Sequence, residues 1–222
     1  MALEIEVLPD PDAVAERGAQ VVAAAAAAAV AARDRFTFAV SGGRTPWAMF
    51  ERLYGRLPWE KVTIFQVDER IAADGDADRN LTHLQRSLPP GGSADVRAMP
   101  VWMEDLEAAA ALYAEALPDQ LDLVHLGLGP DGHTASLVPG DAVLAVLDRD
   151  VALTDVYQGH RRMTLTYPPL NRARQILWLV TGDDKVDALR RLREGDQSIP
   201  SGWIATTNAL VLADTAAAGS RS

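Results

Sequence analysis

The sequence contains no cysteine among its 222 residues. Disulfide bonds and thiolate metal sites are therefore excluded, and cysteine usage sets no limit on the redox compartment. Positive charge is also scarce, because 21 basic residues stand against 31 acidic ones and give a net charge of −10. This balance argues against nucleic acid or an anionic membrane surface as a partner.

Long apolar runs are missing as well. No stretch reaches the ~18 uninterrupted apolar residues of a membrane span. The first six residues have neither the basic part nor the apolar part of a signal peptide. We therefore expect a cytoplasmic protein with no membrane partner.

What the chain does have is an alternation of two kinds of apolar segment. Short runs typical of buried strands alternate with longer segments that have helical spacing. This alternation predicts a single α/β domain, residues 1–222, with a mostly parallel sheet covered by helices on both faces. Residues 215–222 are expected to form a frayed tail. Strands are expected at 3–8, 36–40, 62–67, the first half of 121–140, 151–157, 162–167, 175–180 and 209–213. Helices are expected at 46–57, 80–88 and 103–117, and two further helices are expected to end at residues 33 and 193.

Residues 121–140 join one such strand to a group of chemically active side chains. Asp131 and His133 follow just past the expected carboxyl end of the strand, at the edge where open α/β sheets place ligand sites. The glycines of this stretch allow positive φ and a close approach of the backbone to a ligand. Thr134 or Ser136 is expected to start a short helix with free amides facing the same pocket. Together these features favour acid–base chemistry on an anion.

A glycine-rich loop, Ser41-Gly42-Gly43-Arg44-Thr45-Pro46, follows the strand at 36–40. Its glycines let consecutive N–H groups converge, and the next helix presents the positive end of its dipole. Thr45 suits an N-cap and Pro46 the first helical position. Taken alone, the pattern favours an ordinary strand-to-helix turn.

Four more polar residues occur near strand ends. Asp68, Glu69 and Arg70 close the strand at 62–67, where the planar fork of Arg70 could clamp an oxyanion with two parallel hydrogen bonds. As isolated residues these three favour surface ion pairs. Lys185, one of only two lysines in the chain, lies in an expected first helical turn, where a basic residue opposes the dipole.

The run from Gly127 to Pro139, Gly-Leu-Gly-Pro-Asp-Gly-His-Thr-Ala-Ser-Leu-Val-Pro, resembles the signature of the 6-phosphogluconolactonases, which share a fold with the glucosamine-6-phosphate deaminases. Three further motifs of that family occur in the expected order, so the resemblance covers nearly the whole chain. It implies a Rossmann-like α/β fold of the lactonase type. Val138 stands where the family most often has phenylalanine, and Arg44 where a small residue is common.

The resemblance implies hydrolysis of 6-phospho-D-glucono-1,5-lactone to 6-phosphogluconate in the oxidative pentose phosphate pathway. His133 would act as general base on water, with Asp131 orienting or tuning it. Arg70 would stabilise charge on the carbonyl oxygen or on the carboxylate product, with Asp68 and Glu69 behind it. The phosphate would be held by Ser41, Gly42, Gly43, Arg44, Arg162 and Lys185.

The resemblance also implies what the protein binds. We expect a small anionic sugar-phosphate substrate, no cofactor, no nucleic acid, and a monomer or weak homo-oligomer. Whether Arg161 or Arg162 faces the phosphate stays open. A metal site built from His125, Asp131 and His133 is the alternative to a metal-free site, but His125 is expected in mid-strand as a core histidine.

Two other functions remain in competition. A deaminase that isomerises its sugar typically continues from the histidine into an Ala-Phe-Asn-Glu pattern, whereas here Thr-Ala-Ser-Leu-Val-Pro follows His133 without a carboxylate. A non-catalytic sugar-phosphate sensor would carry a DNA-binding helical domain in front, and only ~35 residues of acidic chain precede the first glycine loop.

Overall fold

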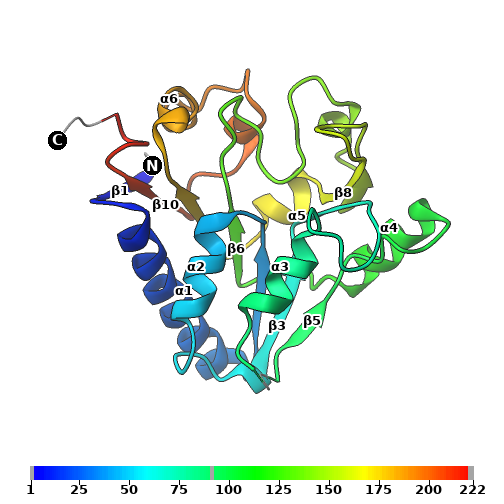
Figure 1. Cartoon of the computed structure of the whole chain (residues 1–222), viewed down its shortest axis with the longest axis horizontal. Coiled ribbons are helices and arrows are strands. Elements are labelled where there is room, and N and C mark those ends of the chain that lie inside the picture. Colours follow the sequence, from blue (N-terminus) through cyan, green and yellow to red (C-terminus); the bar gives the residue numbers. More distant parts are fainter. Residues whose placement is uncertain (1–2, 91–92, 220–222) are drawn as a thin grey trace.

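The computed structural model describes residues 3–90 and 93–219. They form one α/β domain whose central sheet lies between two layers of helices (Figure 1). All seven strands of this sheet are parallel, in the order β1-β10-β9-β6-β2-β3-β5, which confirms the predicted fold class. The strands are β1 (Glu4–Leu8), β2 (Phe36–Val40), β3 (Val62–Gln66), β5 (Asp95–Arg97), β6 (Leu123–Leu126), β9 (Ile176–Val180) and β10 (Ala209–Asp214).

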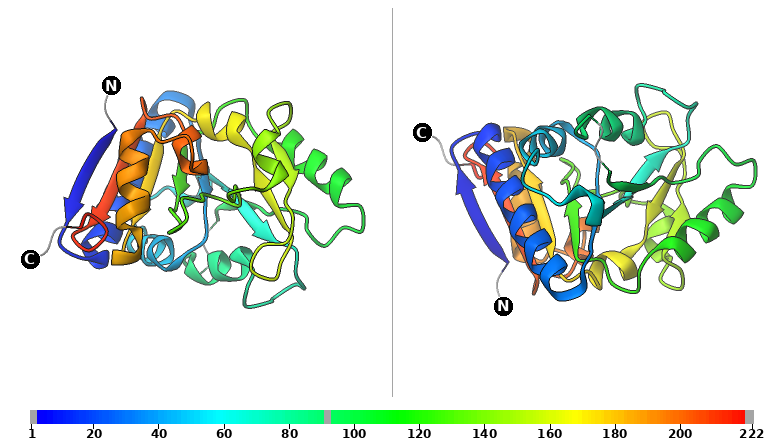
Figure 2. Two further views of the ribbon diagram at one scale, coloured as in Figure 1. Left: turned by 90° about the horizontal axis from the view of Figure 1, so that it is seen from above. Right: turned by 90° about the horizontal axis from the view of Figure 1, so that it is seen from below.

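Each face of the sheet has its own hydrophobic core. Side chains of β2 alternate between the two, because Phe38 and Val40 join one core and Ala39 the other. Figure 2 shows the helices on both sides of the sheet. The first core includes residues of α1 (Pro11–Arg33), α2 (Arg44–Arg52) and α3 (Asn80–Ser87), and the second residues of α4 (Leu106–Ala116), α5 (Tyr167–Asn171) and α6 (Val186–Glu194). Short 3₁₀ turns occur at Trp59–Lys61, Ala142–Ala145, Asp183–Lys185 and Pro200–Trp203.

The alanine-rich helix α1 packs directly on the sheet. Asp10 caps it by accepting a hydrogen bond from the Ala13 amide at 2.8 Å. By length and composition alone, α1 is apolar enough to cross a membrane. In the structure, however, its apolar face is buried, and a Cβ on Gly18 would come within 3.1 Å of Leu179 Cδ2. The small residues therefore allow a close helix–sheet contact.

A second sheet, which the sequence did not predict, stands beside the first. It is antiparallel and has the order β4 (Asp68–Arg70), β8 (Arg162–Leu165), β7 (Val151–Leu153). The Asp-Glu-Arg motif, expected to close the strand at 62–67, is thus a strand of its own that pairs with Arg162–Thr164. Non-local pairing of this kind leaves no signal in the periodicity of a three-residue segment.

Three local expectations were wrong. Residues 134–137 form a tight turn, with the Leu137 amide bonded to the Thr134 carbonyl at 2.9 Å, in place of a short helix. Helix α2 begins at Arg44 with Gly43 as its N-cap, so Thr45 and Pro46 lie inside the first turn. Residues 215–219 form turns in which Ala217 is buried, whereas 220–222 lie outside the described residues.

The order of the strands creates a switch point between β2 and β6. From β2 the sheet continues to β3 and β5 on one side, and from β6 to β9, β10 and β1 on the other. Loops that leave neighbouring strands in opposite directions open a crevice at their carboxyl ends. The two glycine-rich loops predicted as ligand sites follow β2 and β6.

The carboxylate of Glu69 anchors α3 beside this crevice. The side chain is fully buried and accepts hydrogen bonds from the Asn80 amide at 2.7 Å and the Leu81 amide at 2.9 Å. It also lies 3.4 Å from Nε of Arg79, which is equally buried. A negative charge at a helix N-terminus satisfies free amides and complements the dipole.

Replacing Glu69 with alanine should lower the free energy of unfolding by about 3–5 kcal/mol, because the buried Arg79 would keep only the exposed Asp74 as a carboxylate partner and the amides of Asn80 and Leu81 would lose their acceptor. Urea denaturation followed by circular dichroism measures this change. The exposed Glu60 provides a control, since Glu60→Ala should alter stability by less than ~0.5 kcal/mol. Equal denaturation midpoints for Glu69→Ala and the parent would contradict the anchoring role.

Candidate active site

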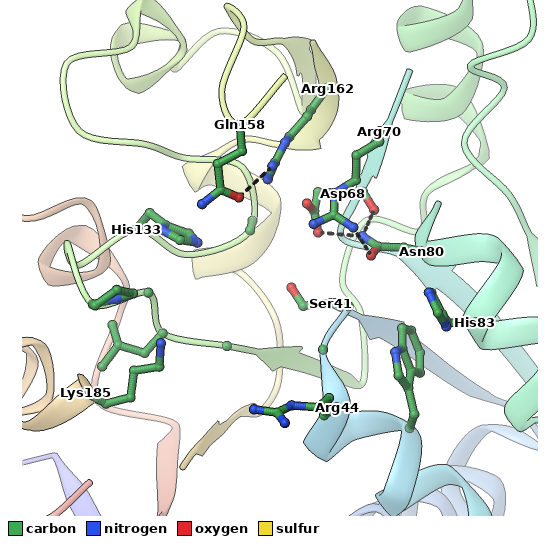
Figure 3. A pocket seen from close by; sticks show the side chains of 18 residues that line it. Ser41, Arg44, Asp68, Arg70, Asn80, His83, His133, Gln158, Arg162 and Lys185 are labelled. Atoms are coloured by element: carbon green, nitrogen blue, oxygen red, sulfur yellow. Dashed lines mark hydrogen bonds between the residues drawn. The ribbon is translucent and has the colours of Figure 1, made fainter. Parts of the chain in front are cut away.

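A cavity of about 580 Å³ lies at the carboxyl edge of the main sheet, where the loops after β2, β6 and β9 meet the small sheet. Figure 3 shows its side chains converging from these separate elements. Apart from Asp131, every predicted site residue lines it: Ser41, Gly42, Gly43, Arg44, Arg70, His133, Arg162 and Lys185. The chain thus brings together residues that are up to 144 positions apart, from Ser41 to Lys185 (185 − 41).

His133 is held by a compact turn after β6. The Gly129 amide donates to the His133 carbonyl at 2.8 Å, and the Gly132 amide donates to the Gly129 carbonyl at 3.0 Å. A Cβ on Gly129 would lie 2.1 Å from Nδ1 of His133, and Gly132 has φ +83°. Both glycines are therefore required for the imidazole to occupy this position.

Asp131 stands behind His133 as its hydrogen-bond partner. Its Oδ1 lies 2.6 Å from Nδ1 of the imidazole and 3.1 Å from the His133 amide. Burial raises the pKa of the Asp131 carboxyl, but the hydrogen bonds and charge of His133 outweigh this effect and hold the pKa below its ordinary value. An ionised Asp131 fixes the proton on Nδ1 and leaves Nε2 free to accept one.

The glycine loop after β2 offers donors to an anion. Oγ of Ser41 is buried and has no hydrogen-bond partner among the described residues. Gly43 provides no side-chain cap, so the first amides of α2 are not occupied by a capping side chain. Gly42 lies directly against Asn80, because a Cβ there would fall 2.0 Å from Asn80 Oδ1. Only glycine lets this loop approach α3 so closely.

Asn80 is a site residue that the sequence analysis missed. It lines the cavity, accepts a hydrogen bond from Arg70 Nη1 at 3.2 Å and donates to the Asp68 carbonyl at 3.0 Å. Arg70 also donates to the Asp78 carbonyl at 2.7 Å. Asn80 was assigned to a helix on spacing alone, and only the tertiary contact with Gly42 and Arg70 reveals its position.

The structure distinguishes the two neighbouring arginines. Arg162 is 3% exposed and lines the cavity, whereas Arg161 is exposed and donates to the Thr154 carbonyl. Burial lowers the pKa of the Arg162 guanidinium; Asp68 opposes this shift and Arg70 adds to it. Two guanidinium groups that raise each other's energy in a partly buried cavity favour an anion between them.

Lys185 contributes a further cation from the opposite wall. It ends the 3₁₀ turn Asp183–Lys185 and directly precedes α6, rather than lying in a regular first helical turn. Its Nζ lies 2.7 Å from Oδ2 of Asp184, whose side chain is 57% exposed. Because the Asp184 carboxylate is exposed to water, its pairing with Nζ is weakened, and an anion in the cavity can compete for Nζ.

His125 does not line the His133 cavity, but a neighbouring one that shares Arg44 and Lys185 with it. It is fully buried in β6, and burial lowers the pKa of its imidazole to about 3, so that it is neutral at working pH. It lines a second cavity of about 270 Å³, next to Thr45 and Thr181. Among residues 3–90 and 93–219, no cluster of three or more His, Asp or Glu side chains has the arrangement of a metal site.

An aromatic wall faces the cavity from α2 and α3. The rings of Trp47 and His83 stack with centroids 6.1 Å apart and an interplanar angle of 18°. Both residues line the cavity, and Nε2 of His83 lies 2.8 Å from the Ala77 carbonyl oxygen. Trp47 was predicted only as part of a helix, because its stacking partner His83 lies in another element.

Comparisons with known proteins agree with this geometry. A sequence model of the family described as glucosamine-6-phosphate isomerases/6-phosphogluconolactonase matches residues 9–212. A 6-phosphogluconolactonase of Nostoc sp. is 33% identical over 238 aligned residues, covering 99% of this chain and 98% of the relative. The crystal structure of a 6-phosphogluconolactonase from Shewanella baltica is similar with a TM-score of 0.87 at 26% identity, covering 96% and 97% of the two chains. A monomeric glucosamine-6-phosphate deaminase shares the fold, with a TM-score of 0.85 at 17% identity and coverage of 99% and 100%.

Proposed function

Because this chain belongs to the family of glucosamine-6-phosphate isomerases and 6-phosphogluconolactonases, we propose that it hydrolyses 6-phospho-D-glucono-1,5-lactone to 6-phospho-D-gluconate. The observation that carries the proposal is the convergence of the Asp131–His133 pair with Arg44, Arg70, Arg162 and Lys185 on one cavity. A base beside several cations suits water attack on a lactone that carries a phosphate.

The reaction is assigned to His133 as follows. With Nδ1–H donated to Asp131, the free Nε2 takes a proton from water as the water oxygen attacks the lactone carbonyl. The resulting oxyanion receives hydrogen bonds from an arginine, for which Arg70 is assigned. The ring C–O bond then breaks, and the imidazolium returns its proton to the leaving ring oxygen. No serine or cysteine nucleophile is required.

The phosphate is assigned to the part of the cavity that the glycine loop after β2 lines. Ser41, Gly42 and Gly43 provide a hydroxyl and backbone amides, and the positive end of α2 faces the same place. Arg44, Arg162 and Lys185 add charge from three different elements. We further propose that the protein is cytoplasmic, monomeric or weakly self-associating, and that it needs no cofactor. Its net charge of −10 disfavours nucleic acid and anionic membranes as partners.

The deaminase alternative is disfavoured by the run that follows His133, which contains no carboxylate that reaches the cavity. Opening a sugar ring and moving a proton require a further acid–base side chain near the histidine. The first carboxylate after His133 is Asp141, which caps the 3₁₀ turn at Ala142–Ala145 and accepts a hydrogen bond from the Asp155 amide. Asp141 is not among the residues that line the cavity.

Two assays on the purified protein test the proposal. Fresh 6-phosphogluconolactone is coupled to 6-phosphogluconate dehydrogenase, and NADPH formation is compared with the spontaneous hydrolysis rate. Glucosamine 6-phosphate is supplied separately and ammonia release is measured. We expect the first rate to rise in proportion to protein, with no ammonia. Ammonia release alone would favour the deaminase, and sugar-phosphate binding without either reaction would favour a sensor.

Replacing His133 with asparagine should lower kcat about 10²- to 10⁴-fold, because the general base is lost while a polar side chain remains. The coupled assay measures this loss, and circular dichroism shows that the fold is intact. His125→Leu is the control, since that imidazole is buried and does not line the cavity of His133. A fully active His133→Asn variant would exclude the mechanism.

Replacing Lys185 with alanine should raise KM about ten- to a hundredfold, because one charge-assisted hydrogen bond to the phosphate is worth ~1.5–3 kcal/mol. If that contact is equal in ground and transition states, kcat changes little. Lys61, the other lysine, pairs with the exposed Asp34, so Lys61→Ala provides a matched control with unchanged KM. Unphosphorylated gluconolactone should be a poor substrate for all three proteins. Its efficient hydrolysis by the parent would refute the phosphate pocket.

A further inference from the structure

A strained hairpin tip lies beside the cavity. The backbones of Tyr157 and His160 are paired, with amide-to-carbonyl distances of 3.0 and 3.3 Å, around a two-residue loop. Both loop residues have positive φ, +50° at Gln158 and +86° at Gly159. Such a loop matches the twist of its strands, but a left-handed glutamine is uncommon. A strained residue of this kind persists where the surrounding contacts determine its position.

Tyr157 contacts both parts of the proposed site. Its hydroxyl donates to Oδ2 of Asp131 at 3.3 Å, the carboxylate oxygen that His133 does not use. The rings of Tyr157 and His133 meet edge to face, 5.5 Å apart and at 68°. Cζ of Arg162 lies over the tyrosine ring, 5.1 Å from its centroid, and Arg162 Nη2 donates to the Tyr157 carbonyl at 3.4 Å.

Gln158 closes a continuous chain of side chains. Arg162 Nη2 donates to Gln158 Oε1 at 3.5 Å, and Gln158 Nε2 donates to the Tyr157 hydroxyl at 3.3 Å. From there the chain continues through Asp131 to Nδ1 of His133. Figure 3 shows Gln158 reaching Arg162 at the edge of the cavity that His133 lines.

We propose that Tyr157 is a positioning residue that fixes the Asp131–His133 pair through its hydroxyl and Arg162 through its ring. A carboxylate bound only by the histidine would be free to rotate about its side chain, and the tyrosine hydroxyl holds its second oxygen. Burial, followed by the negative charge of Asp131, raises the pKa of Tyr157, so the hydroxyl stays protonated and acts as a donor. The aromatic face, in turn, stabilises the guanidinium that faces the substrate.

Two substitutions separate these roles. Tyr157→Phe keeps the ring and removes the hydroxyl, and it should lower kcat about tenfold with KM within about twofold of the parent, since it loses one hydrogen bond to a charged group. Tyr157→Leu removes both and should also raise KM about five- to tenfold, because Arg162 loses its aromatic support. Tyr54→Phe, at a surface tyrosine that is 40% exposed, is the matched control.

The kinetic effects rest on the proposed lactonase activity, so a second measurement avoids that assumption. The imidazole protons of His133, assigned by their loss in His133→Asn, are followed by NMR as a function of pH. Tyr157→Phe should move the midpoint upward by about 0.5 pH unit, since Asp131 then keeps more negative charge for the imidazolium. The other charged groups lining the cavity, Arg44, Asp68, Arg70, Arg162 and Lys185, are unchanged by this substitution.

The outcomes distinguish the two hypotheses. A parent without lactonase activity refutes the proposed function, and the NMR midpoint still tests Tyr157. An active parent with Tyr157→Phe equal to it in kcat and in midpoint overturns the positioning role. Equal losses of kcat and thermal stability in both Tyr157 variants, with an unmoved midpoint, would show a structural role only.

Discussion

The site depends on one buried carboxylate, that of Glu69. Glu69 belongs to β4, accepts a hydrogen bond from the Asn80 amide at the N-terminus of α3, and pairs with the buried Arg79. Asn80 in turn accepts from Arg70 and lies against Gly42. A buried charge tolerates little displacement, because each lost partner leaves an expensive unsatisfied group. The position of Glu69 therefore determines where one arginine and the glycine loop can be.

Sheet topology supplies the second constraint. The switch between β2 and β6 opens a crevice for the glycine loop and for the turn that carries His133. The small antiparallel sheet closes the crevice from the side, because pairing of Arg70 with Arg162 places two guanidinium groups on neighbouring strands. Neither sheet alone forms the site: loops of the parallel sheet provide the base and the amides, and the antiparallel sheet provides Arg70 and Arg162.

Local sequence patterns predicted the features whose causes are local. Buried apolar runs identified β2, β6 and β9, and glycines next to Asp131, His133 and Ser41 identified the loops that line the cavity.

The edge strand β5 was missed because it is short and two of its residues, in the sequence Asp-Val-Arg, are charged. The sequence carried no signal for Asn80 and Tyr157, because their partners Arg70 and Asp131 lie 10 or more positions away. Gln158 was missed because its position depends on a left-handed backbone. Thr45 was assigned as a cap, but its hydroxyl lies 3.0 Å from that of Thr181, in a loop 136 positions further on.

The distribution of charge explains how an acidic protein can hold an anion. Against a net charge of −10, the cavity gathers Arg44, Arg70, Arg162 and Lys185 around a single lining carboxylate, Asp68. Burial lowers the pKa of Arg162, and the charge of the neighbouring Arg70 lowers it further; an anionic ligand between the two groups relieves that repulsion. Hydrolysis of a lactone adds a negative charge to the molecule it acts on. A cavity with this charge is therefore complementary to the oxyanion that forms on the way, which is where stabilisation accelerates a reaction.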